Sequence, residues 1–517
     1  MDLNPEQNVI KTPKLNFTPY AKGLGWLYFE CLRNNRDKIA QIEGHTGQRD
    51  TFGQLLDRCI RVTLAMRAMG LKPGDIVSLC TFNHLDSCVP QIASLFLGAV
   101  VSGVDPTLTS NEIAFLLRQV MPKVIFVQED CVEKVEGVLE AIGSKATIVV
   151  FGGHSRHLSF SDLLEGHSRV EDFKPRTAEN LHETVFIFFS SGTTGHPKGI
   201  CHNHYSLMHH TSKKGIVEGV TRLVYPRYDP DNAWQMFDYP LTFAFLNVTQ
   251  MLIMLDQGRP ENVRTDSLAA IIIGGDAPPK EKLLAMRAMF PNALVWQSYG
   301  QTEIMTAITY FNPTNPKHLR FIGEKPSSVG CAVPGMWYKI ADIETGEALG
   351  PDTPGELRVK TEFQTSGYHN TDSSGIWDEG GWLKTGDLAY YDQDLCFYIV
   401  GRVKEMFKFR EWHIVPTVLE EILTSHPAIA GAAVIGVPHE MDSHHPMAVV
   451  VLKPSGEKTS EVEIQQFLER RVNDRQRLRG GVKFVSQLPL TPTGKINRKQ
   501  VREMFVGLCQ NTLHTQK

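Results

Sequence analysis

The chain has 517 residues, of which 42% are hydrophobic and 21% are charged, so it can bury a large core and is unlike a disordered or fibrous protein. Its 53 basic and 57 acidic residues give a net charge of −4, which excludes an overall positive electrostatic field that would attract nucleic acid. The nine cysteines are an odd number and form no C-x-x-C pair. That pattern excludes a disulfide framework and argues against a zinc ribbon.

Both chain ends and the apolar runs indicate a soluble, intracellular protein in a reducing compartment. The first six residues contain no basic-then-apolar signal region. The longest nearly apolar run, residues 93–104, is shorter than the roughly 20 residues that span a bilayer, so we expect no transmembrane segment. Residues 514–517 do not form an S-K-L type peroxisomal address.

Strand and helix patterns alternate between residues 76 and 151. The expected strands are 76–81, 100–104, 123–127 and 147–151, and the expected helices are 85–97, 111–120 and 131–142, with Ser110 as the N-cap of the second helix. Strands that alternate with helices of roughly 10–15 residues favour βαβ units. The sequence therefore predicts an α/β fold with a largely parallel sheet and helices on both of its faces.

The pattern changes after Gly330. Short strands at 337–342, 355–360 and 395–400 are separated by Gly, Pro and Asp turns, which indicates a β-rich subdomain. A compact segment follows, with helices at 416–425 and 460–472 and strands at 429–436 and 447–452. We place the domain boundary at residue 400, so that a large N-terminal domain (1–400) precedes a small α+β C-terminal domain (401–517).

A buried-type strand at 184–189 runs directly into a loop of hydroxyl residues and glycines. Backbone N–H groups in such a loop can surround phosphate oxygens, and a lysine adds positive charge. The loop is not a Walker A loop, because the G-K-[S/T] ending and its spacing are absent. The candidate phosphate-binding residues are Ser190, Ser191, Gly192, Thr193, Thr194, Gly195 and Lys198.

Further motifs follow in an order that resembles the adenylate-forming superfamily of acyl-CoA synthetases, 4-coumarate–CoA ligases and firefly-type luciferases. The resemblance extends from about residue 50 to about residue 505. Its motifs are Gly274-Gly275-Asp276-Ala277-Pro278, Tyr299-Gly300-Gln301-Thr302-Glu303, Trp382-Leu383-Lys384-Thr385-Gly386-Asp387, Arg402, and Thr491-Pro492-Thr493-Gly494-Lys495.

The resemblance implies a role for each motif. Gly274 and Gly275 form the turn beside adenine, Tyr299 and Gly300 lie close to that ring, and Thr302 contacts phosphate. Glu303 holds Mg²⁺, Asp387 and Arg402 bind the ribose, and Lys495 is the adenylation lysine on a mobile C-terminal domain. Lys408 is a further catalytic candidate, because its loop lies beside the incoming thiol in the family.

The implied reaction joins a small carboxylic acid to CoA with ATP and Mg²⁺ as cofactors. A carboxylate attacks the α-phosphate of ATP, so the site must position two anions and neutralise their charge. The acid is expected to be fatty or aryl, but the sequence does not identify it, nor the oligomeric state. Many relatives are peroxisomal, so the compartment stays open between peroxisome and cytoplasm.

Three features depart from the family pattern. The stretch between Gly199 and Gly274 is short and lacks the strand and the P-x-F-H-type segment that line the acyl pocket in relatives. Gly401 replaces the usual hinge aspartate, and Glu411 replaces a glycine in the loop beside the thiol. A side chain there can block the thiol or strain a turn of positive φ. Two alternatives therefore stay open: a non-catalytic relative that binds nucleotide or a protein partner, and an enzyme that performs adenylation only.

Two groups of histidines need separate consideration. His202, His204, His209 and His210 follow the phosphate loop on an expected helix, without Cys or carboxylate partners at ligand spacing, so we do not expect a metal site there. His439, His444 and His445 are interpreted as exposed loop residues.

Overall fold

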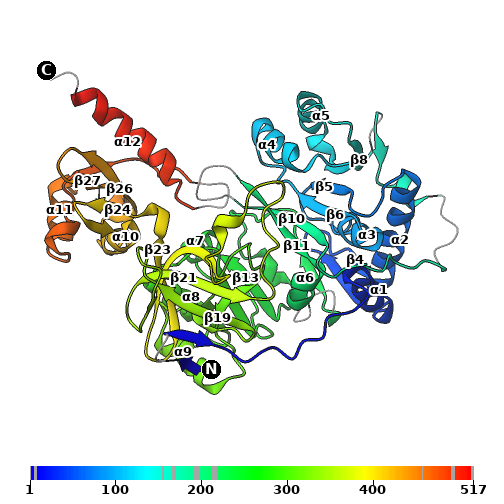
Figure 1. Cartoon of the computed structure of the whole chain (residues 1–517), viewed down its shortest axis with the longest axis horizontal. Helices are drawn as coiled ribbons and strands as arrows, with labels where there is room; N and C mark the ends of the chain where they lie inside the picture. Colours follow the sequence, from blue (N-terminus) through cyan, green and yellow to red (C-terminus); the bar gives the residue numbers. More distant parts are fainter. Residues whose placement is uncertain are drawn as a thin grey trace.

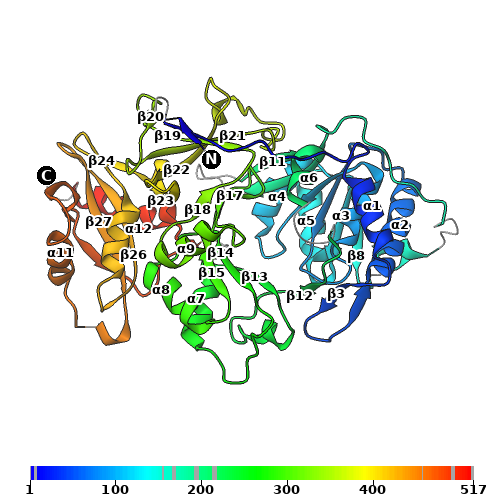
Figure 2. The same cartoon turned by 90° about the horizontal axis from the view of Figure 1, so that it is seen from below.

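The computed structural model describes residues 2–4, 8–153, 156–165, 171–190, 197–211, 218–456, 458–490 and 495–513. In Figures 1 and 2 the blue and cyan helical layers lie at one end of the molecule and the orange and red C-terminal elements at the other, while the N-terminal strands cross to the middle and lie beside β19. The predicted fold class is confirmed: a large mixed α/β region built from several sheets is followed by a small α+β unit.

A seven-stranded sheet forms the first layer, in the order β11-β10-β6-β5-β7-β8-β9. Its strands are β5 (Ile76–Cys80), β6 (Val100–Gly103), β7 (Val124–Gln128), β8 (Thr147–Phe151), β9 (Leu158–Ser159), β10 (Thr184–Ser190) and β11 (Lys198–Asn203). Every pairing in it is parallel except that of β10 with β11. The predicted parallel sheet is therefore confirmed, with one antiparallel hairpin at its edge.

Helices cover both faces of this sheet, because alternate strand residues point to opposite sides. In β7, Phe126 packs into the core of one face, and Ile125 packs into the core of the other. The first face is covered by α1 (Leu24–Asn34), α2 (Phe52–Ala68) and α3 (Val89–Leu97), and the second by α4 (Ser110–Val120) and α5 (Val132–Ala141).

Two predicted helix starts were wrong. The N-cap of α4 is Thr109 instead of Ser110, since the Thr109 side chain accepts from the Glu112 N–H and the Glu112 side chain returns to the Thr109 backbone in a capping box. Helix α3 begins at Val89 instead of residue 85, because His84 and Ser87 bond each other in a local turn before it.

A mainly antiparallel sheet lies in the middle of the chain, in the order β1-β2-β19-β21-β22-β23-β18-β17-β16 with β20 beside β19. Its strands are β1 (Asp2–Asn4), β2 (Val9–Lys11), β16 (Tyr299–Gly300), β17 (Ala307–Tyr310), β18 (Gly330–Ala332), β19 (Met336–Ala341), β20 (Ala348–Leu349), β21 (Gly355–Thr361), β22 (Leu383–Tyr391) and β23 (Cys396–Arg402). This is the predicted β-rich subdomain, and it carries Tyr299, Asp387 and Arg402.

Two three-stranded sheets contain the strands of the shortened stretch between Gly199 and Gly274. One is parallel, with β13 (Phe243–Asn247), β14 (Ala270–Gly274) and β15 (Leu294–Gln297), and is packed by α7 (Val248–Gln257) and α8 (Lys280–Met289). In the other, β12 (Arg222–Val224) pairs with β3 (Ile39–Glu43), which also pairs with β4 (Arg49–Thr51). The short segment thus returns to the N-terminal part and pairs one edge of β3.

The remaining helices of the large region are short. Helix α6 (His204–Thr211) follows β11 directly, and α9 (Pro316–Glu324) packs on β15 and β18. Single turns of 3-10 helix lie at Glu129–Cys131, Asp162–Leu164, Gln235–Asp238, Ser374–Ile376 and Val403–Glu405.

The C-terminal unit is a five-stranded sheet with helices around it. Its strands are β24 (Phe407–Phe409), β25 (Trp412–Ile414), β26 (Ile429–His439), β27 (Ser443–Leu452) and β28 (Val482–Phe484), and its helices are α10 (Pro416–Thr424), α11 (Glu461–Glu469) and α12 (Arg498–Leu513), with 3-10 turns at Pro454–Gly456 and Asp474–Gln476. The predicted elements are present, although the β26–β27 hairpin is longer than expected. The boundary at residue 400 stays a prediction.

None of the described helices is both long enough and apolar enough to cross a membrane.

We expect Tyr338→Phe to lower the stability of the antiparallel sheet. The buried Tyr338 hydroxyl donates to the Ile308 carbonyl at 2.7 Å and accepts from the Val333 N–H at 2.8 Å, so the variant leaves two buried backbone groups unpaired, at a cost of about 1–3 kcal/mol. Thermal denaturation followed by circular dichroism should show a lower Tm. Tyr390→Phe is the control, because that ring is held by stacking on Tyr398 at 4.8 Å; equal Tm values for the two variants would contradict this account.

Candidate nucleotide site

A buried carboxylate, Asp387, lies at the centre of the candidate site. The pairing of β22 with β23 sets Asp387 opposite Arg402, whose Nε lies 2.8 Å from Asp387 Oδ1. The Tyr299 hydroxyl and the Gln301 side chain both donate to Oδ2, the latter at 2.6 Å. Gln301 also donates to the Thr385 carbonyl at 2.7 Å, which ties the segment after β16 to β22.

Burial raises the pKa of Asp387 above its ordinary value, even though several neighbours oppose that shift. The opposing groups are the Arg402 charge, the hydrogen bonds from Tyr299 and Gln301, and the charge of Lys495. Lys495 belongs to the C-terminal unit, so this charge interaction links that unit to the large domain. The other residues of its motif, Thr491 to Gly494, lie outside the described part of the chain.

A second carboxylate, Glu303, lies within reach of the same charges. Burial raises the pKa of Glu303, while Arg402 and Lys198 lower it and Asp387 raises it further. Tyr368 hydrogen-bonds to Glu303, and burial together with that carboxylate raises the pKa of Tyr368 to about 12. The Lys198 ammonium lies over the Tyr368 ring, 4.5 Å from its centroid, in a cation–π contact. Lys198, Glu303 and Tyr368 therefore form one group.

The phosphate-loop candidates are described only at the two ends of the loop. Ser190 ends β10 and is paired with Lys198, the first residue of β11. Ser191, Gly192, Thr193, Thr194 and Gly195 lie outside the described residues. The β10–β11 register brings both ends of the loop beside Tyr368, because β11 also bridges from Ile200 to Tyr368.

The side chain of His202 holds the main chain of Thr302 in place. Its Nε2 donates to the Thr302 carbonyl at 2.7 Å, and the Glu303 carbonyl accepts from the Thr365 N–H at 2.7 Å. Burial lowers the pKa of His202 to about 4, so its ring is neutral near pH 7. His204 Nδ1 accepts from the Leu24 N–H at 3.1 Å.

The described histidines of this first group make separate contacts. The rings of His202 and His204 face different backbone groups, and the His209 ring stacks on Phe363 at 3.8 Å. The side chain of His210 lies outside the described residues.

Neighbouring groups pack closely around the glycines at the ends of β14 and β16. A Cβ on Gly274 would lie 2.6 Å from the Phe245 ring, and one on Gly300 would lie 2.5 Å from the Thr306 carbonyl oxygen. Gly275 has a φ of +89°, which favours glycine. These close approaches account for the glycines without a ligand, so their part in adenine binding stays a prediction.

Lys408 lies away from the Asp387 group. Its ammonium is 3.5 Å from the Glu344 carboxylate on the β19–β20 turn, and both side chains are exposed. The loop that follows differs from expectation in one respect: the residue with positive φ is Arg410, at +53°, and not Glu411, which is exposed. The Glu411 side chain therefore causes no φ > 0 strain. At Gly401, which replaces the usual hinge aspartate, an added Cβ would lie 3.0 Å from Val415 Cγ1.

Comparison with known proteins decides the family. The model of the AMP-binding enzyme family matches residues 28–220 and 215–369, and that of the AMP-binding enzyme C-terminal domain matches residues 418–495. The chain belongs to the AMP-binding enzyme family. The predicted resemblance to the adenylate-forming superfamily is confirmed.

Relatives of two kinds resemble the chain over nearly its whole length. Luciferin 4-monooxygenase of Photuris pensylvanica is 29% identical, with 97% of this chain and 98% of that protein covered. 4-Coumarate–CoA ligase 1 of Petroselinum crispum is 28% identical, with 96% and 97% covered.

Solved structures support the same fold. The luciferase-like enzyme from the nonluminescent mealworm Zophobas morio is 32% identical and has a TM-score of 0.72, with 77% of this chain and 100% of that chain covered. ATP-bound MatB from Rhodopseudomonas palustris is 22% identical and has a TM-score of 0.83, with 93% and 99% covered.

The comparisons also locate the shortened segment. The family model matches in two pieces that meet at residues 215–220, and the alignment with the Photuris protein is 546 positions long against a chain of 517. That alignment must therefore contain gaps in this chain, opposite residues of the Photuris protein. Further along the chain, β13 exposes Phe243 (39%) and Phe245 (59%) on one face.

Sequence reasoning missed Gln301, Tyr368 and the supporting His202. Gln301 occupies the variable position of the Y-G-x-T-E motif, so the motif carries no signal for it. Tyr368 is far from every motif and reaches Glu303 through the tertiary contacts of its segment, which bridges to β11 and bonds the Glu303 backbone through Thr365. His202 was considered only as a metal ligand.

We expect Glu303→Gln to stabilise the protein while it removes a charge from the site. The pKa of Glu303 in the folded state is raised above 4.5, its ordinary value. Ionisation of Glu303 therefore lowers the stability of the folded state as the pH rises above about 4.5, and the loss is complete once the pH exceeds the folded-state pKa. At pH 7.5 the neutral amide should raise Tm by on the order of 2 °C, and the gain should disappear near pH 4. Scanning fluorimetry from pH 4 to 8 tests this prediction, with Glu261→Gln at an exposed position as the control. A lower Tm for Glu303→Gln than for the wild type at pH 7.5 would contradict it and show that neighbouring groups compensate the Glu303 charge.

Proposed function

We propose that the chain is an ATP-dependent, AMP-forming carboxylate–CoA ligase that activates a fatty or aryl acid. The observation that carries the proposal is the meeting of Asp387 and Arg402 with Lys495 from the C-terminal unit, next to Glu303 and Lys198. Elements from both parts of the chain thereby contribute charge to one place, as a reaction between two anions requires.

The proposed first step forms an acyl adenylate. A carboxylate oxygen of the acid attacks the α-phosphorus of ATP, the bond from that phosphorus to the bridging oxygen breaks, and pyrophosphate leaves. In this scheme Asp387 and Arg402 bind the ribose, Tyr299 lies beside adenine with Gly274, Gly275 and Gly300, and Lys198 with the 190–195 loop holds the departing phosphates. Lys495 neutralises charge between the attacking carboxylate and the α-phosphate.

The residues at Glu303 fit a magnesium ion. A carboxylate oxygen is the type of ligand that Mg²⁺ prefers. The pKa of Glu303 stays raised despite Lys198 and Arg402, so the described cations do not fully compensate this buried anion, and a divalent cation would favour its ionised form. When bound there, Mg²⁺ supplies charge neutralisation to the phosphates, while Thr302 contacts a phosphate oxygen.

The proposed second step transfers the acyl group to CoA. The CoA sulfur attacks the acyl carbonyl carbon, the bond to the phosphate oxygen of AMP breaks, and the thiol proton is lost. Lys408, in the β24 strand before the 410–411 turn, is the C-terminal residue that we assign to this step. Its present contact is the exposed ion pair with Glu344, so the step requires the C-terminal unit to change its position.

A second candidate function is an enzyme that forms the adenylate without completing the thioester, or a relative without turnover. The exposed aromatic side chains of Phe243 and Phe245 favour it, since they lie in the stretch between Gly199 and Gly274 that is shorter than in the family pattern. Luciferases and CoA ligases are similar to the chain at nearly equal identity.

The proposal predicts that Lys495→Ala abolishes ATP–pyrophosphate exchange. The loss should be about 10²–10³-fold, because an electrostatic donor to the α-phosphate is removed. The measurement uses radiolabelled pyrophosphate with a panel of fatty and aryl acids. Lys499→Ala is the matched control, since that lysine is exposed on α12 and pairs loosely with Glu503 at 3.9 Å. Absence of exchange in the wild-type protein with every acid, alongside measurable ATP binding, would favour the relative without turnover.

The thioester step is tested separately by changing the turn next to Lys408. Glu411→Gly should raise the ratio of acyl-CoA to acyl-AMP several-fold and leave pyrophosphate exchange unchanged, because only the path of the thiol is altered. Glu411→Ala separates the two causes: it removes the side chain but does not add the backbone freedom of glycine. If neither variant changes the product ratio, Glu411 is not an obstacle to CoA.

A further inference from the structure

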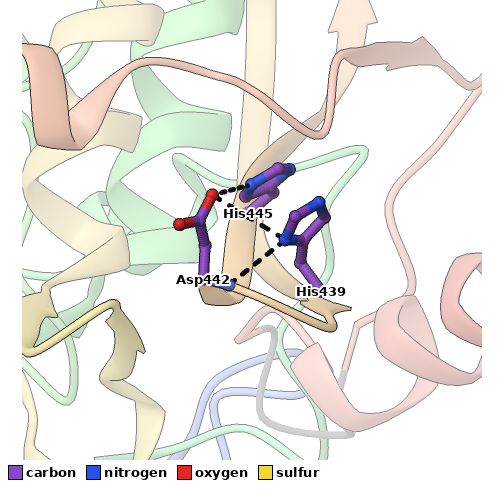
Figure 3. A group of neighbouring side chains, drawn as sticks. All are labelled: His439, Asp442 and His445. Carbon is purple, nitrogen blue, oxygen red and sulfur yellow. Dashed lines mark hydrogen bonds and ion pairs between the residues drawn. The ribbon is translucent and has the colours of Figure 1, made fainter.

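Three potential metal ligands meet at the tip of the β26–β27 hairpin. His439 is the last residue of β26, His445 lies near the start of β27, and Asp442 lies in the turn between the two strands. The interpretation of His439, His444 and His445 as loop residues was therefore wrong, because the strands continue to the tip; His439 is exposed as expected, and His444 and His445 are partly buried. Figure 3 shows the Asp442 carboxylate directed at both imidazole rings.

The hairpin register brings the two imidazoles to one face. His445 is paired with Val437, and His439 follows Val437 by two residues, so both side chains point to the same side of the ribbon. Their rings stack with centroids 3.8 Å apart and an interplanar angle of 19°. His444 is paired with Pro438, and its side chain points to the opposite face.

The spacing of the ligand atoms is close to that of a tetrahedral site. His445 Nε2 is 2.9 Å and His439 Nδ1 is 3.7 Å from Asp442 Oδ2, and one ligand atom from each of the three residues lies within 4.8 Å of the others. Ligand atoms at about 2.0–2.1 Å from a tetrahedral zinc ion are about 3.4 Å apart. The two distances lie on either side of that value, so the three ligand atoms are close enough to share one ion once the stacked imidazole rings turn and direct their nitrogens to one point.

A neighbouring arginine fixes the orientation of the carboxylate. Arg410 Nε donates to Asp442 Oδ1 at 2.8 Å, and the Arg410 N–H donates to the Asp442 carbonyl at 2.7 Å. The other carboxylate oxygen, Oδ2, is thereby directed to the imidazoles. Outer groups that hold a ligand in this way are a regular part of metal sites and affect their affinity.

We propose that His439, Asp442 and His445 bind a divalent cation of the zinc class at the tip of this hairpin. Two nitrogens and one oxygen suit zinc better than Mg²⁺ or Ca²⁺, which take oxygen ligands. The His439 side chain is 40% exposed, so water completes the coordination. Binding displaces the proton shared by His445 and Asp442 Oδ2 and the 3.2 Å hydrogen bond from the Asp442 N–H to His439 Nδ1.

The site is separate from the proposed magnesium position at Glu303, and its test does not depend on ligase activity. Because Arg410 is both the partner of Asp442 and the residue of positive φ in the β24–β25 turn, an ion at the hairpin tip also restrains that turn.

Titration of the full-length protein tests the proposal. After treatment with EDTA and removal of the chelator, ZnCl₂ is added at pH 7.5 in a calorimeter, and Co²⁺ is added to a parallel sample for its absorption spectrum. We expect one ion per chain at this site, a tetrahedral-type Co²⁺ spectrum, and no heat from the site with Mg²⁺. His439→Ala, Asp442→Asn and His445→Ala should each weaken zinc binding at least tenfold.

His444→Ala is the matched control, because it removes a histidine from the same hairpin but from the other face; its zinc affinity should equal that of the wild type. Because zinc binds the folded state, it should also raise the Tm of the wild type and of His444→Ala. It should leave the Tm of the three ligand variants unchanged. Wild-type zinc binding that is absent, or that survives in all three variants, overturns the proposal. If a variant does not fold, the wild-type Co²⁺ spectrum decides: an octahedral-type spectrum also overturns it.

Discussion

The buried charge of Asp387 is the constraint on which the centre of the molecule depends. Taking a carboxylate out of water costs several kcal/mol, and that cost is offset only by well-placed partners. Here the partners come from separate segments: Arg402 across the β22–β23 ladder, and Tyr299 and Gln301 from the chain at β16. Satisfying one carboxylate therefore fixes three parts of the antiparallel sheet. The pKa of Asp387 remains raised by burial all the same, which makes the approach of a further cation, Lys495, favourable and couples the C-terminal unit to the sheet.

The balance of charge around this carboxylate explains what kind of ligand the site suits. Lys198, Arg402 and Lys495 face Asp387 and Glu303, so these five groups together carry only one net positive charge. A triphosphate brings several negative charges, which the side chains alone do not neutralise. The shortfall must come from a metal ion and from backbone N–H groups, and a loop rich in glycine and hydroxyl residues begins at Ser190, next to Lys198. The proposed use of Mg²⁺ thus follows from the charges as well as from the identity of Glu303.

Much of the fold could be predicted where hydrophobic pattern alone determines an element. Strand β8 was predicted at its observed bounds because a run of apolar residues is flanked by polar ones, whereas the start of α3 was missed because side-chain bonds in a short turn replace the first helical turn. The hairpin tip was missed because its strands end in polar residues, so no alternation marks them. At the site, the motif residues could be named from the sequence, and the geometry joins several of them. Tyr368 could not be named, since tertiary contacts of its segment with β11 and with the Glu303 backbone bring it to that carboxylate.

The shortened segment affects one half of the proposed chemistry more than the other. Every charged group of the candidate site is encoded outside it, in β11, at 299–303, in β22 and β23, and in the C-terminal unit. After the shortened part, β12 pairs with β3, with Arg222 Nη2 donating to Gln41 Oε1 at 2.7 Å. Phe245 is 59% exposed, and its ring lies close to Gly274, at the end of the strand that leads to the proposed adenine turn. Exposed aromatic surface at that place is suited to an apolar ligand. In the proposed scheme, the deletion therefore changes the wall that would meet the acid and leaves the groups that would meet the nucleotide intact.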